Sequence, residues 1–303
     1  MKIMVLGGQG QIGWELQRAL APLGDVMALR REARGDASGD LENADGLRRA
    51  LRRLRPDVIA NAAAYTDVDQ AESEPERARR VNAEGPEILA AEARRLDAWL
   101  IQYSTDYVFD GSGTEPRQED APASPLNVYG RTKWQGEQAV RDIGCRHLIL
   151  RTQWVYSSRR NNFLRTVLRL ALERDALEVV DDQIGAPTGA DLVADVTAHL
   201  VRSLSAEQGS GTYHVAARGE TTRHAYACFV VESARRTGWP LRLTERAIAP
   251  VARENRPGTA VRPRNGRLSV GRLERTLNVR MPHWRTGVAG VIAHMRPHLG
   301  ETL

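Results

Sequence analysis

The chain has 303 residues, of which 42% are hydrophobic and 27% are charged, and its formal net charge at pH 7 is +5. This length and apolar content allow a sizeable core, in one two-lobed domain or two modest ones. Basic and acidic residues are interleaved along the whole chain, and no basic tract carries interspersed aromatics. The pattern therefore excludes an obvious nucleic-acid surface and favours a small anionic ligand such as a nucleotide.

The cysteines and the apolar segments predict where the protein is found. Cys145 and Cys228 are far apart and lack the spacing of a disulfide framework or a zinc site. The apolar run at the N-terminus is too short for a signal peptide, and no later segment is long enough to span a bilayer. We therefore expect a cytoplasmic protein without a membrane partner.

The first half of the chain alternates between short apolar runs and longer segments with helical spacing. The expected strands are 3–6, 26–29, 58–60, 99–103 and 147–150. The expected helices are 11–20, 44–54, 75–96 and one that contains Lys133. Because a crossover between parallel strands needs about a helix's length of chain, this alternation predicts a parallel sheet covered on both faces. The expected fold class is α/β, with a Rossmann-type doubly wound sheet.

Beyond residue 151 the chain becomes more irregular. Loops rich in Asn, Gly, Pro and Arg (157–162, 183–189 and 252–267) separate expected helices at 163–173, 190–203 and 223–237. This pattern predicts a smaller C-terminal lobe. Ligands of open α/β sheets bind at the carboxyl ends of the strands, so we expect the lobe to close over that edge and hold the substrate.

A glycine-rich turn follows the first expected strand and opens the first expected helix. Gly7, Gly10 and Gly13 have the spacing of a dinucleotide fingerprint. Such glycines allow a tight turn, close approach of the backbone to a pyrophosphate, and close packing of helix on strand. An isolated glycine turn is often only a turn, but at the start of a βαβ pattern it predicts nucleotide binding.

The end of the second strand distinguishes NAD from NADP, because an acidic residue there binds a ribose hydroxyl and an arginine accommodates a 2′-phosphate. This chain has Arg30 and Arg31 there. Arg30 therefore predicts NADPH, with NADH as a tolerated alternative. Two ordinary surface arginines are the competing interpretation. Farther along, 39–41 is a candidate for adenine contact, and the small residues of 61–66 suit a cofactor lying against the backbone.

The candidate catalytic groups are Thr105, Tyr129 and Lys133. Thr105 follows the strand 99–103 at its carboxyl end, and Tyr129 and Lys133 lie one turn apart on a helix. Only two of the 43 basic residues are lysine, so Lys133 indicates a need for a compact cation, with an ordinary surface charge as the competing interpretation. An ammonium near a phenol favours the phenolate, so we expect Lys133 to lower the pKa of Tyr129. The same lysine can hold a nicotinamide ribose.

The glycine turn, the threonine after the fourth strand and the Tyr-x-x-x-Lys pair resemble the extended short-chain dehydrogenase/reductase family. Within it, the chain is similar to the dTDP-4-dehydrorhamnose reductases from end to end. The matching segments are 10–16, 55–59, 61–66, 71–75, 103–111, 125–133, 151–156, 182–188 and 262–268. The resemblance implies reduction of the C4 ketone of dTDP-4-dehydro-β-L-rhamnose by NAD(P)H, the last step of dTDP-L-rhamnose synthesis for lipopolysaccharide or cell-wall polysaccharide.

The resemblance also implies roles for individual residues. Tyr129 is the general acid at the C4 oxygen, Thr105 hydrogen-bonds that oxygen, and Lys133 holds the ribose. The implied substrate contacts are Thr105, Asp106 and Trp154, although Trp154 can equally be a core aromatic. The implied cofactor contacts are Gly7, Gly10, Gln11, Ile12, Gly13, Arg30, Asp40, Leu41, Ala64, Tyr65, Thr66, Tyr103, Tyr129 and Lys133.

The resemblance further implies two lobes, with residues 1–151 as the NAD(P)-binding domain, completed by elements around 175–215, and 152–303 mainly as the sugar-nucleotide lobe. Arginines of the second lobe are plausible diphosphate ligands, with plain surface charge as the alternative; they are Arg256, Arg262 and Arg267.

Some relatives bridge a dimer through magnesium. Glu15 and Asp191 match that pattern, but Ala190 supplies no oxygen, so the sequence does not support a metal site. A monomer and a homodimer both stay open.

Two other functions compete with this interpretation. One is a reductase or epimerase of a different nucleotide-linked 4-keto sugar. An epimerase needs a retained cofactor or an added acid-base pair, and the sequence shows no such pair. The other is a non-catalytic regulatory subunit that binds nucleotide and a partner enzyme. Such a subunit can dispense with catalytic residues, whereas Thr105, Tyr129 and Lys133 are all present.

Overall fold

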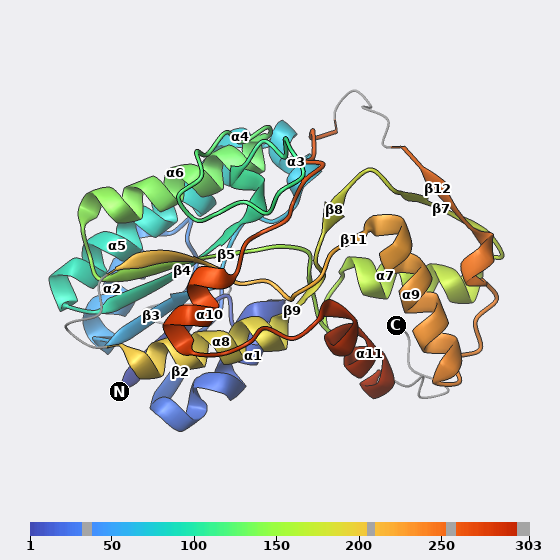
Figure 1. Cartoon of the computed structure of the whole chain (residues 1–303). Helices are drawn as coiled ribbons and strands as arrows, with labels where there is room; N and C mark the ends of the chain where they lie inside the picture. Colours follow the sequence, from blue (N-terminus) through green and yellow to red (C-terminus); the bar gives the residue numbers. More distant parts are fainter. Residues whose placement is uncertain (32–37, 205–209, 253–258, 296–303) are drawn as a thin grey trace.

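The computed structural model describes residues 1–31, 38–204, 210–252 and 259–295. Figure 1 shows two lobes, a larger one built on a central sheet and a smaller one that contains α7, α9 and α11. The α/β fold class and the doubly wound parallel sheet predicted from the sequence are confirmed. The smaller lobe lies at the carboxyl ends of the strands, as Figure 1 shows.

The central sheet has six parallel strands in the order β10-β5-β4-β3-β1-β2. Its strands are β1 (Lys2–Leu6), β2 (Asp25–Leu29), β3 (Val58–Asn61), β4 (Trp99–Thr105), β5 (His147–Thr152) and β10 (Gly211–His214). After β2 the chain returns to the other side of β1, so the direction of winding reverses between β1 and β3. Crevices at such a reversal are where open α/β sheets bind ligands.

Helices cover both faces of this sheet because successive strand residues point to opposite sides. In β1, Ile3 and Val5 join one buried cluster, whereas Met4 and Leu6 join another. The first cluster is completed by α1 (Gln11–Leu20) and α8 (Ala190–Ser203). The second is completed by α2 (Ala44–Leu54), α5 (Gly85–Leu96) and α6 (Val128–Ile143).

The single helix predicted for 75–96 is interrupted. The structure has α4 (Pro75–Arg79), a wide π turn at Arg80–Glu84, and then α5. Pro86 has no N–H to donate to the carbonyl four residues earlier, so an uninterrupted α-helical ladder cannot form there. The turn places Asn82 where its side chain accepts from the Tyr65 N–H at 2.9 Å and donates to the Tyr65 carbonyl at 3.0 Å. The interruption of the helix therefore lets Asn82 hold the backbone of the segment around Tyr65, which follows the end of β3.

The smaller lobe has its own core, formed by one face each of α7, α9 and α11. Its elements are β6 (Val155–Tyr156), α7 (Phe163–Glu173), β7 (Leu177–Val180), β8 (Ile184–Gly185), β9 (Thr188–Gly189), β11 (Thr221–Thr222), α9 (Arg223–Arg236), β12 (Ile248–Val251) and α11 (Trp284–His294). The remaining helices are α3 (Val68–Ser73) and α10 (Gly271–Leu277).

Three elements from the second half of the chain belong to the sheet side of the molecule. Strand β10 pairs with β5, α8 packs against α1, and α10 packs against β10. By contrast, β7 pairs with β12 outside the central sheet. In the described parts of the chain, every helix is too short or too polar to cross a membrane.

Candidate active site

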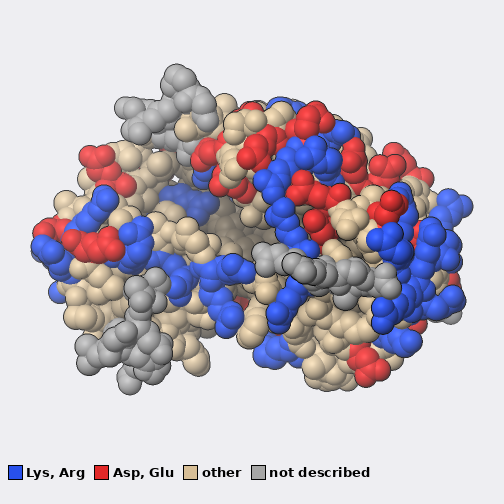
Figure 2. Space-filling model, turned by 180° about the vertical axis from the view of Figure 1, so that it is seen from behind, with Lys and Arg blue, Asp and Glu red and all other residues tan. Residues whose placement is uncertain are grey.

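A cavity of about 1250 Å³ opens between the two lobes at the carboxyl ends of β1, β3, β4 and β5. Figure 2 shows Lys and Arg side chains bordering the hollow in the middle of the molecule. Arginines from both lobes line it, namely Arg30, Arg31, Arg160, Arg223 and Arg262. The cavity therefore suits a ligand that carries several negative charges.

The glycine turn after β1 forms one end of the cavity. Gly7 has φ +73°, a conformation that side-chain-bearing residues rarely adopt, and a Cβ there would lie 2.7 Å from the Ala63 nitrogen. A Cβ on Gly13 would lie 2.1 Å from the Gly7 carbonyl oxygen. Gly7 therefore lets the turn pack against the end of β3. Gly13 lets α1 approach the end of β1.

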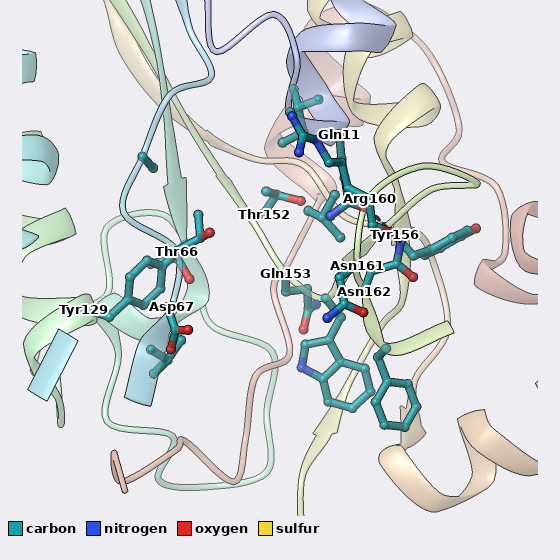
Figure 3. A pocket seen from close by; sticks show the side chains of 18 of the residues that line it. Gln11, Thr66, Asp67, Tyr129, Thr152, Gln153, Tyr156, Arg160, Asn161 and Asn162 are labelled. Atoms are coloured by element: carbon teal, nitrogen blue, oxygen red, sulfur yellow. Dashed lines mark hydrogen bonds between the residues drawn. The ribbon is translucent and has the colours of Figure 1, made fainter. Parts of the chain in front are cut away.

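The smaller lobe is hydrogen-bonded to this turn. The Gln11 Oε1 atom accepts from the Ser157 hydroxyl at 3.0 Å and from the Asn162 amide at 2.9 Å. The Arg160 guanidinium donates to the Gln9 carbonyl at 2.9 Å. Figure 3 shows Gln11, Arg160 and Asn162 together at one side of the cavity. The loop 157–162 thus places polar groups beside the expected pyrophosphate position.

The two arginines after β2 differ in their partners. Arg31 donates to Glu42 at 3.0 Å, and its Nε lies 3.8 Å from Asp40 Oδ1. Arg30 is exposed and lines the cavity, and it makes no ion pair with another described residue. Arg30 is therefore the better candidate for a 2′-phosphate, because Arg31 is already neutralised.

Thr105 ends β4 and caps the short 3₁₀ turn that follows. Its hydroxyl oxygen accepts from the Tyr107 N–H at 3.1 Å, and its hydroxyl hydrogen is donated to Asp106 Oδ1 at 3.1 Å. Thr105 and Asp106 are both buried and line the cavity. A strand end followed by a tight turn thus holds both polar side chains at the sheet edge.

Helix α6 carries Tyr129 and Lys133 into the same cavity. Its N-cap, Asn127, accepts from the Gly130 N–H at 2.8 Å and fixes the start of the helix. A Cβ on Gly130 would lie 2.2 Å from the Tyr107 carbonyl, so this glycine lets α6 approach the turn after Thr105. The Lys133 Nζ donates to the Tyr103 carbonyl at 2.6 Å. Lysine and threonine are therefore held by adjacent parts of β4.

The expectation that Lys133 lowers the pKa of Tyr129 is wrong for the free protein. Burial raises the pKa of Tyr129, which the Thr105 hydroxyl lowers in part and Asp106 raises further. Burial also lowers the pKa of Lys133 to about 8, although the negative charge of Glu137 raises this pKa in part. Burial is the largest influence on the pKa of each group, and it disfavours the charged form of both. Tyr129 is therefore a neutral phenol with a proton to give.

A buried ion network lies behind Lys133, one turn farther along α6. Glu137 is fully buried and accepts from Arg151 at 2.9 and 2.7 Å and from Arg141 at 2.7 Å. Because both carboxylate oxygens of Glu137 accept hydrogen bonds from guanidinium groups, the buried charge of Glu137 is compensated. The network anchors α6 to β5 and keeps a negative charge near Lys133.

Asp106 has an unusual ionisation for a carboxyl group. Burial raises the pKa of Asp106 to about 7, and the Thr105 hydroxyl and the Arg223 charge lower it only in part. The folded state therefore holds this proton between about pH 4 and pH 7, where the unfolded chain has lost it. Stability contributed by Asp106 is present below pH 4 and is lost as pH rises through 7.

Replacing Asp106 with asparagine should remove this pH dependence. We expect the melting temperature of wild type to fall between pH 5 and pH 8 by several degrees more than that of Asp106→Asn. The difference corresponds to a free energy on the order of a few kcal/mol. Thermal denaturation of both proteins across this range measures it, and all other titrating groups cancel in the comparison. Parallel curves for the two proteins would contradict the raised pKa.

Trp154 lies two residues beyond the end of β5, on a backbone with φ +46°. Its indole stacks on Tyr226 with 16° between the ring planes, and the Arg223 guanidinium lies 3.7 Å from the indole ring centroid. Burial lowers the pKa of Arg223 to about 10, so this group stays charged at neutral pH. Trp154 is only partly buried and lines the cavity, so it is more than a core aromatic.

Most of the residues predicted from the sequence are brought together here. Those that line the cavity are Gly7, Gly10, Gln11, Ile12, Arg30, Ala64, Thr66, Tyr103, Thr105, Asp106, Tyr129, Lys133 and Trp154. Gly13, Asp40, Leu41 and Tyr65 do not line it. Leu41 packs in the core against Gly85, and the Tyr65 hydroxyl donates to Glu74 at 3.1 Å. The side chain of Tyr103 also turns into the core, where its hydroxyl meets Thr197 at 2.7 Å.

The predicted diphosphate arginines are placed differently. Arg262 lines the cavity and is paired with Asp69 at 2.8 Å. Arg267 is bound to Glu220 and does not line the cavity, so its guanidinium is already used elsewhere. Arg256 lies outside the described residues.

The two acidic residues that match the magnesium pattern of some relatives contact other groups here. Glu15 pairs with Arg18 at 3.3 Å, and Asp191 accepts from the Leu192 N–H at 2.8 Å. Among the residues that the structure describes, no group of three or more His, Cys, Asp or Glu side chains is arranged to hold a metal ion.

The cavity residues that the sequence reasoning missed include Gln153, Arg160 and Arg223. Gln153 follows the end of β5, so the strand-end rule that found Thr105 also applies to it. Arg160 lies in a loop whose path cannot be read from composition. Arg223 begins α9 and reaches the cavity only because the smaller lobe folds back over the sheet.

Comparisons with known proteins agree with this geometry. The family model of the RmlD substrate binding domain matches residues 1–296. A dTDP-4-dehydrorhamnose reductase from Salmonella typhimurium is 48% identical over 296 residues, which cover 97% of this chain and 98% of that protein. A crystal structure of dTDP-4-dehydrorhamnose reductase from Bacillus anthracis in complex with NADP is 31% identical. It superimposes with a TM-score of 0.87 and covers 97% of this chain and 99% of that one.

A second solved structure, a dTDP-4-dehydrorhamnose reductase from Clostridium acetobutylicum, has a TM-score of 0.88 at 30% identity. It covers 98% of this chain and 100% of that chain. Because the family model and these relatives span the chain almost from end to end, the chain belongs to the RmlD substrate binding domain family, the family of the dTDP-4-dehydrorhamnose reductases.

Proposed function

We propose that this chain reduces the C4 ketone of dTDP-4-dehydro-β-L-rhamnose with NADPH and so forms dTDP-β-L-rhamnose. The observation that carries the proposal is the meeting of Thr105, Tyr129 and Lys133 in a cavity that begins at a dinucleotide turn. High identity to reductases over nearly the full chain supports the same reaction. The complete set of catalytic groups argues against a purely regulatory subunit.

The residues present fit NADPH. Gly7, Gly10 and Gln11 line the cavity at the N-terminus of α1, where backbone N–H groups and the helix dipole favour an anion. Arg30 lies at the end of β2 and has a guanidinium available for a 2′-phosphate. When bound, NADPH supplies the hydride for carbonyl reduction.

Tyr129 is proposed to protonate the C4 oxygen as charge develops there. Its raised pKa keeps the proton on the free enzyme, and an alkoxide is basic enough to remove it. The Thr105 hydroxyl is the second donor to this oxygen. Because that hydroxyl points at Asp106 in the free protein, we propose that it turns to the ketone oxygen on binding. Protonation of Asp106 near pH 7 eases this change.

Lys133 is proposed to hold the nicotinamide ribose. Its Nζ is a buried point charge with several donor hydrogens, of which the Tyr103 carbonyl takes one. Its remaining hydrogens are available to ribose hydroxyls. Glu137 supports the charged form of Lys133 by raising the pKa of its ammonium group against the effect of burial.

Arg30 should decide the preference for NADPH over NADH. We expect Arg30→Asp to lower the ratio of kcat/KM for NADPH to that for NADH by roughly tenfold to hundredfold, because a charge-assisted contact is replaced by repulsion. Arg31→Ala is the matched comparison and should change the ratio less, since Glu42 already neutralises that side chain. Steady-state kinetics with both cofactors measure the ratio. An unchanged ratio in Arg30→Asp would show that Arg30 does not contact the 2′-phosphate of the cofactor.

Three further assignments belong to the proposal. We place the cofactor on the sheet side, formed by 1–151 together with α8 and β10, and the sugar nucleotide mainly on the smaller lobe. We propose a cytoplasmic location, since both described cysteines are free thiols and the substrate is made where nucleotides are. A monomer or a homodimer is compatible with the surface of this chain.

The direct test is NADPH oxidation by the purified protein. We expect turnover when dTDP-4-dehydro-β-L-rhamnose is supplied by the upstream dehydratase and epimerase, and none with dTDP-glucose alone. A second nucleotide-linked 4-keto sugar with another configuration serves as the comparison. Faster reduction of that sugar would assign the chain to a different pathway.

A further inference from the structure

Gln153 is a buried polar residue that the catalytic proposal does not use. It is 3% exposed, it lines the cavity, and its Oε1 atom has no hydrogen-bond partner within the described chain. Buried amide groups are nearly always hydrogen-bonded, because an unpaired one loses the hydration it had in the unfolded chain. Gln153 therefore brings to the cavity wall an amide group whose oxygen is not committed to a described partner.

The register of the sheet places Gln153 beside the reaction centre. Thr152 at the end of β5 pairs with Thr105 at the end of β4. Gln153 and Asp106 are the next residues along these two strands, so both stand at the same sheet edge. Figure 3 shows Gln153 across the open space of the cavity from Tyr129. A ligand whose ketone meets Tyr129 thus presents its neighbouring atoms to Gln153.

Two glycines leave the space in which the Gln153 amide lies. A Cβ on Gly185 would lie 2.6 Å from Oε1, and a Cβ on Gly266 would lie 3.2 Å from Oε1 and 2.7 Å from Asp106 Oδ2. Both glycines therefore leave the space that the amide and the carboxyl group occupy.

We propose that Gln153 hydrogen-bonds a ring hydroxyl of the sugar near the C4 ketone and makes the enzyme select sugars that carry it. This inference rests on the proposed function. A hydroxyl both donates and accepts, and an amide offers one group of each kind, so the two are complementary. Whichever way the amide is turned, one polar atom of Gln153 meets the hydroxyl. Asp106 lies close enough to share the recognition of neighbouring hydroxyls.

The test couples a change in the enzyme to a change in the substrate. Gln153→Met keeps the length of the side chain and removes its hydrogen bonds. We expect it to lower kcat/KM for dTDP-4-dehydro-β-L-rhamnose by roughly tenfold or more, because a buried polar partner is left unpaired. With the 2-deoxy and 3-deoxy analogues, wild type should lose a similar factor for one of them, and Gln153→Met should lose little further for that same analogue.

The controls separate the possible failures. Gln118→Met changes an exposed glutamine outside the cavity lining and should leave kcat/KM unchanged. NADPH affinity, measured by fluorescence titration, should be the same in all variants. Equal losses of Gln153→Met on all three substrates, or no loss at all, would overturn the inference and leave Gln153 with a structural role or none. Failure of wild type to reduce the natural substrate would instead contradict the proposed function.

Discussion

Replacing Tyr129 with phenylalanine is expected to lower kcat by about 10²–10⁴-fold while NADPH binding stays close to that of wild type. Phenylalanine keeps the ring and its edge-to-face contact with Tyr107, whose centroid lies 5.6 Å away, but it has no proton to give. The hydride step then develops an unprotonated alkoxide that only Thr105 stabilises. Single-turnover oxidation of NADPH measures the loss apart from product release.

A fluorescence titration with NADPH is the control for this variant, because the other implied cofactor contacts, including Lys133 and the glycine turn, are unchanged. Thermal denaturation should show a small change at most, since one buried hydroxyl is removed. Near-normal turnover of Tyr129→Phe would show that another group protonates the substrate. Thr105 and Asp106, both in the same cavity, would then be the groups to test.

Lys133→Arg is the second large effect that we expect, although the formal charge is unchanged. Lys133 is 4% exposed and its Nζ is 2.6 Å from the Tyr103 carbonyl, which leaves no space for a planar guanidinium group. Displacement of the helix or the ribose by about 1 Å is enough to lower kcat/KM roughly hundredfold. Arg131→Lys, an exposed position on the same helix, is the matched exchange and should have no effect.

The pH profile gives a second readout of Lys133. Burial lowers the pKa of Lys133 to about 8, so the ammonium is present below this pH and is lost as the pH rises through it. We expect kcat/KM of the free enzyme to decline above about pH 8 in wild type. In Lys133→Arg the remaining activity should show no such decline, because a guanidinium stays charged. If kcat/KM declined in the same way above pH 8 in both proteins, the decline would not be due to the titration of Lys133.

Local patterns predicted the sheet side of the molecule well. The strands β1 to β5 and their crossover helices follow from apolar periodicity, because each segment is buried by contacts whose period is visible in the sequence. The same logic failed at 75–96, where one proline replaced an expected continuous helix with a π turn. Strand β10 is as short as β3, but its sequence Gly-Thr-Tyr-His lacks the apolar run that marked β3.

The site was predicted unevenly for a related reason. Residues at strand ends and on α6, such as Thr105 and Lys133, follow from position within a regular element. Arg160 and Arg223 reach the cavity from the smaller lobe, and their placement depends on how that lobe packs against the sheet. The ionisation of the site was also beyond the sequence, because burial decides it. The pKa of Asp106 rises to about 7 for this reason.

The packing of Lys133 is consistent with the choice of a compact cation there. In a chain where nearly every cation is arginine, Lys133 lies buried with its ammonium group on the Tyr103 carbonyl at the end of β4. Glu137, one turn farther along α6, stabilises the positive charge of Lys133 and accepts a hydrogen bond from Arg151. The choice of lysine therefore follows from the available space as much as from charge.

The central claim is that this chain delivers hydride from NADPH to C4 of a nucleotide-linked 4-keto sugar. The most direct measurement supplies NADPH carrying deuterium at both C4 positions of the nicotinamide, together with dTDP-4-dehydro-β-L-rhamnose, and locates the label in the product by NMR. We predict one deuterium for each dTDP-β-L-rhamnose formed, bonded to C4 of the sugar. An unlabelled sugar, or a label on any other carbon, would contradict the account.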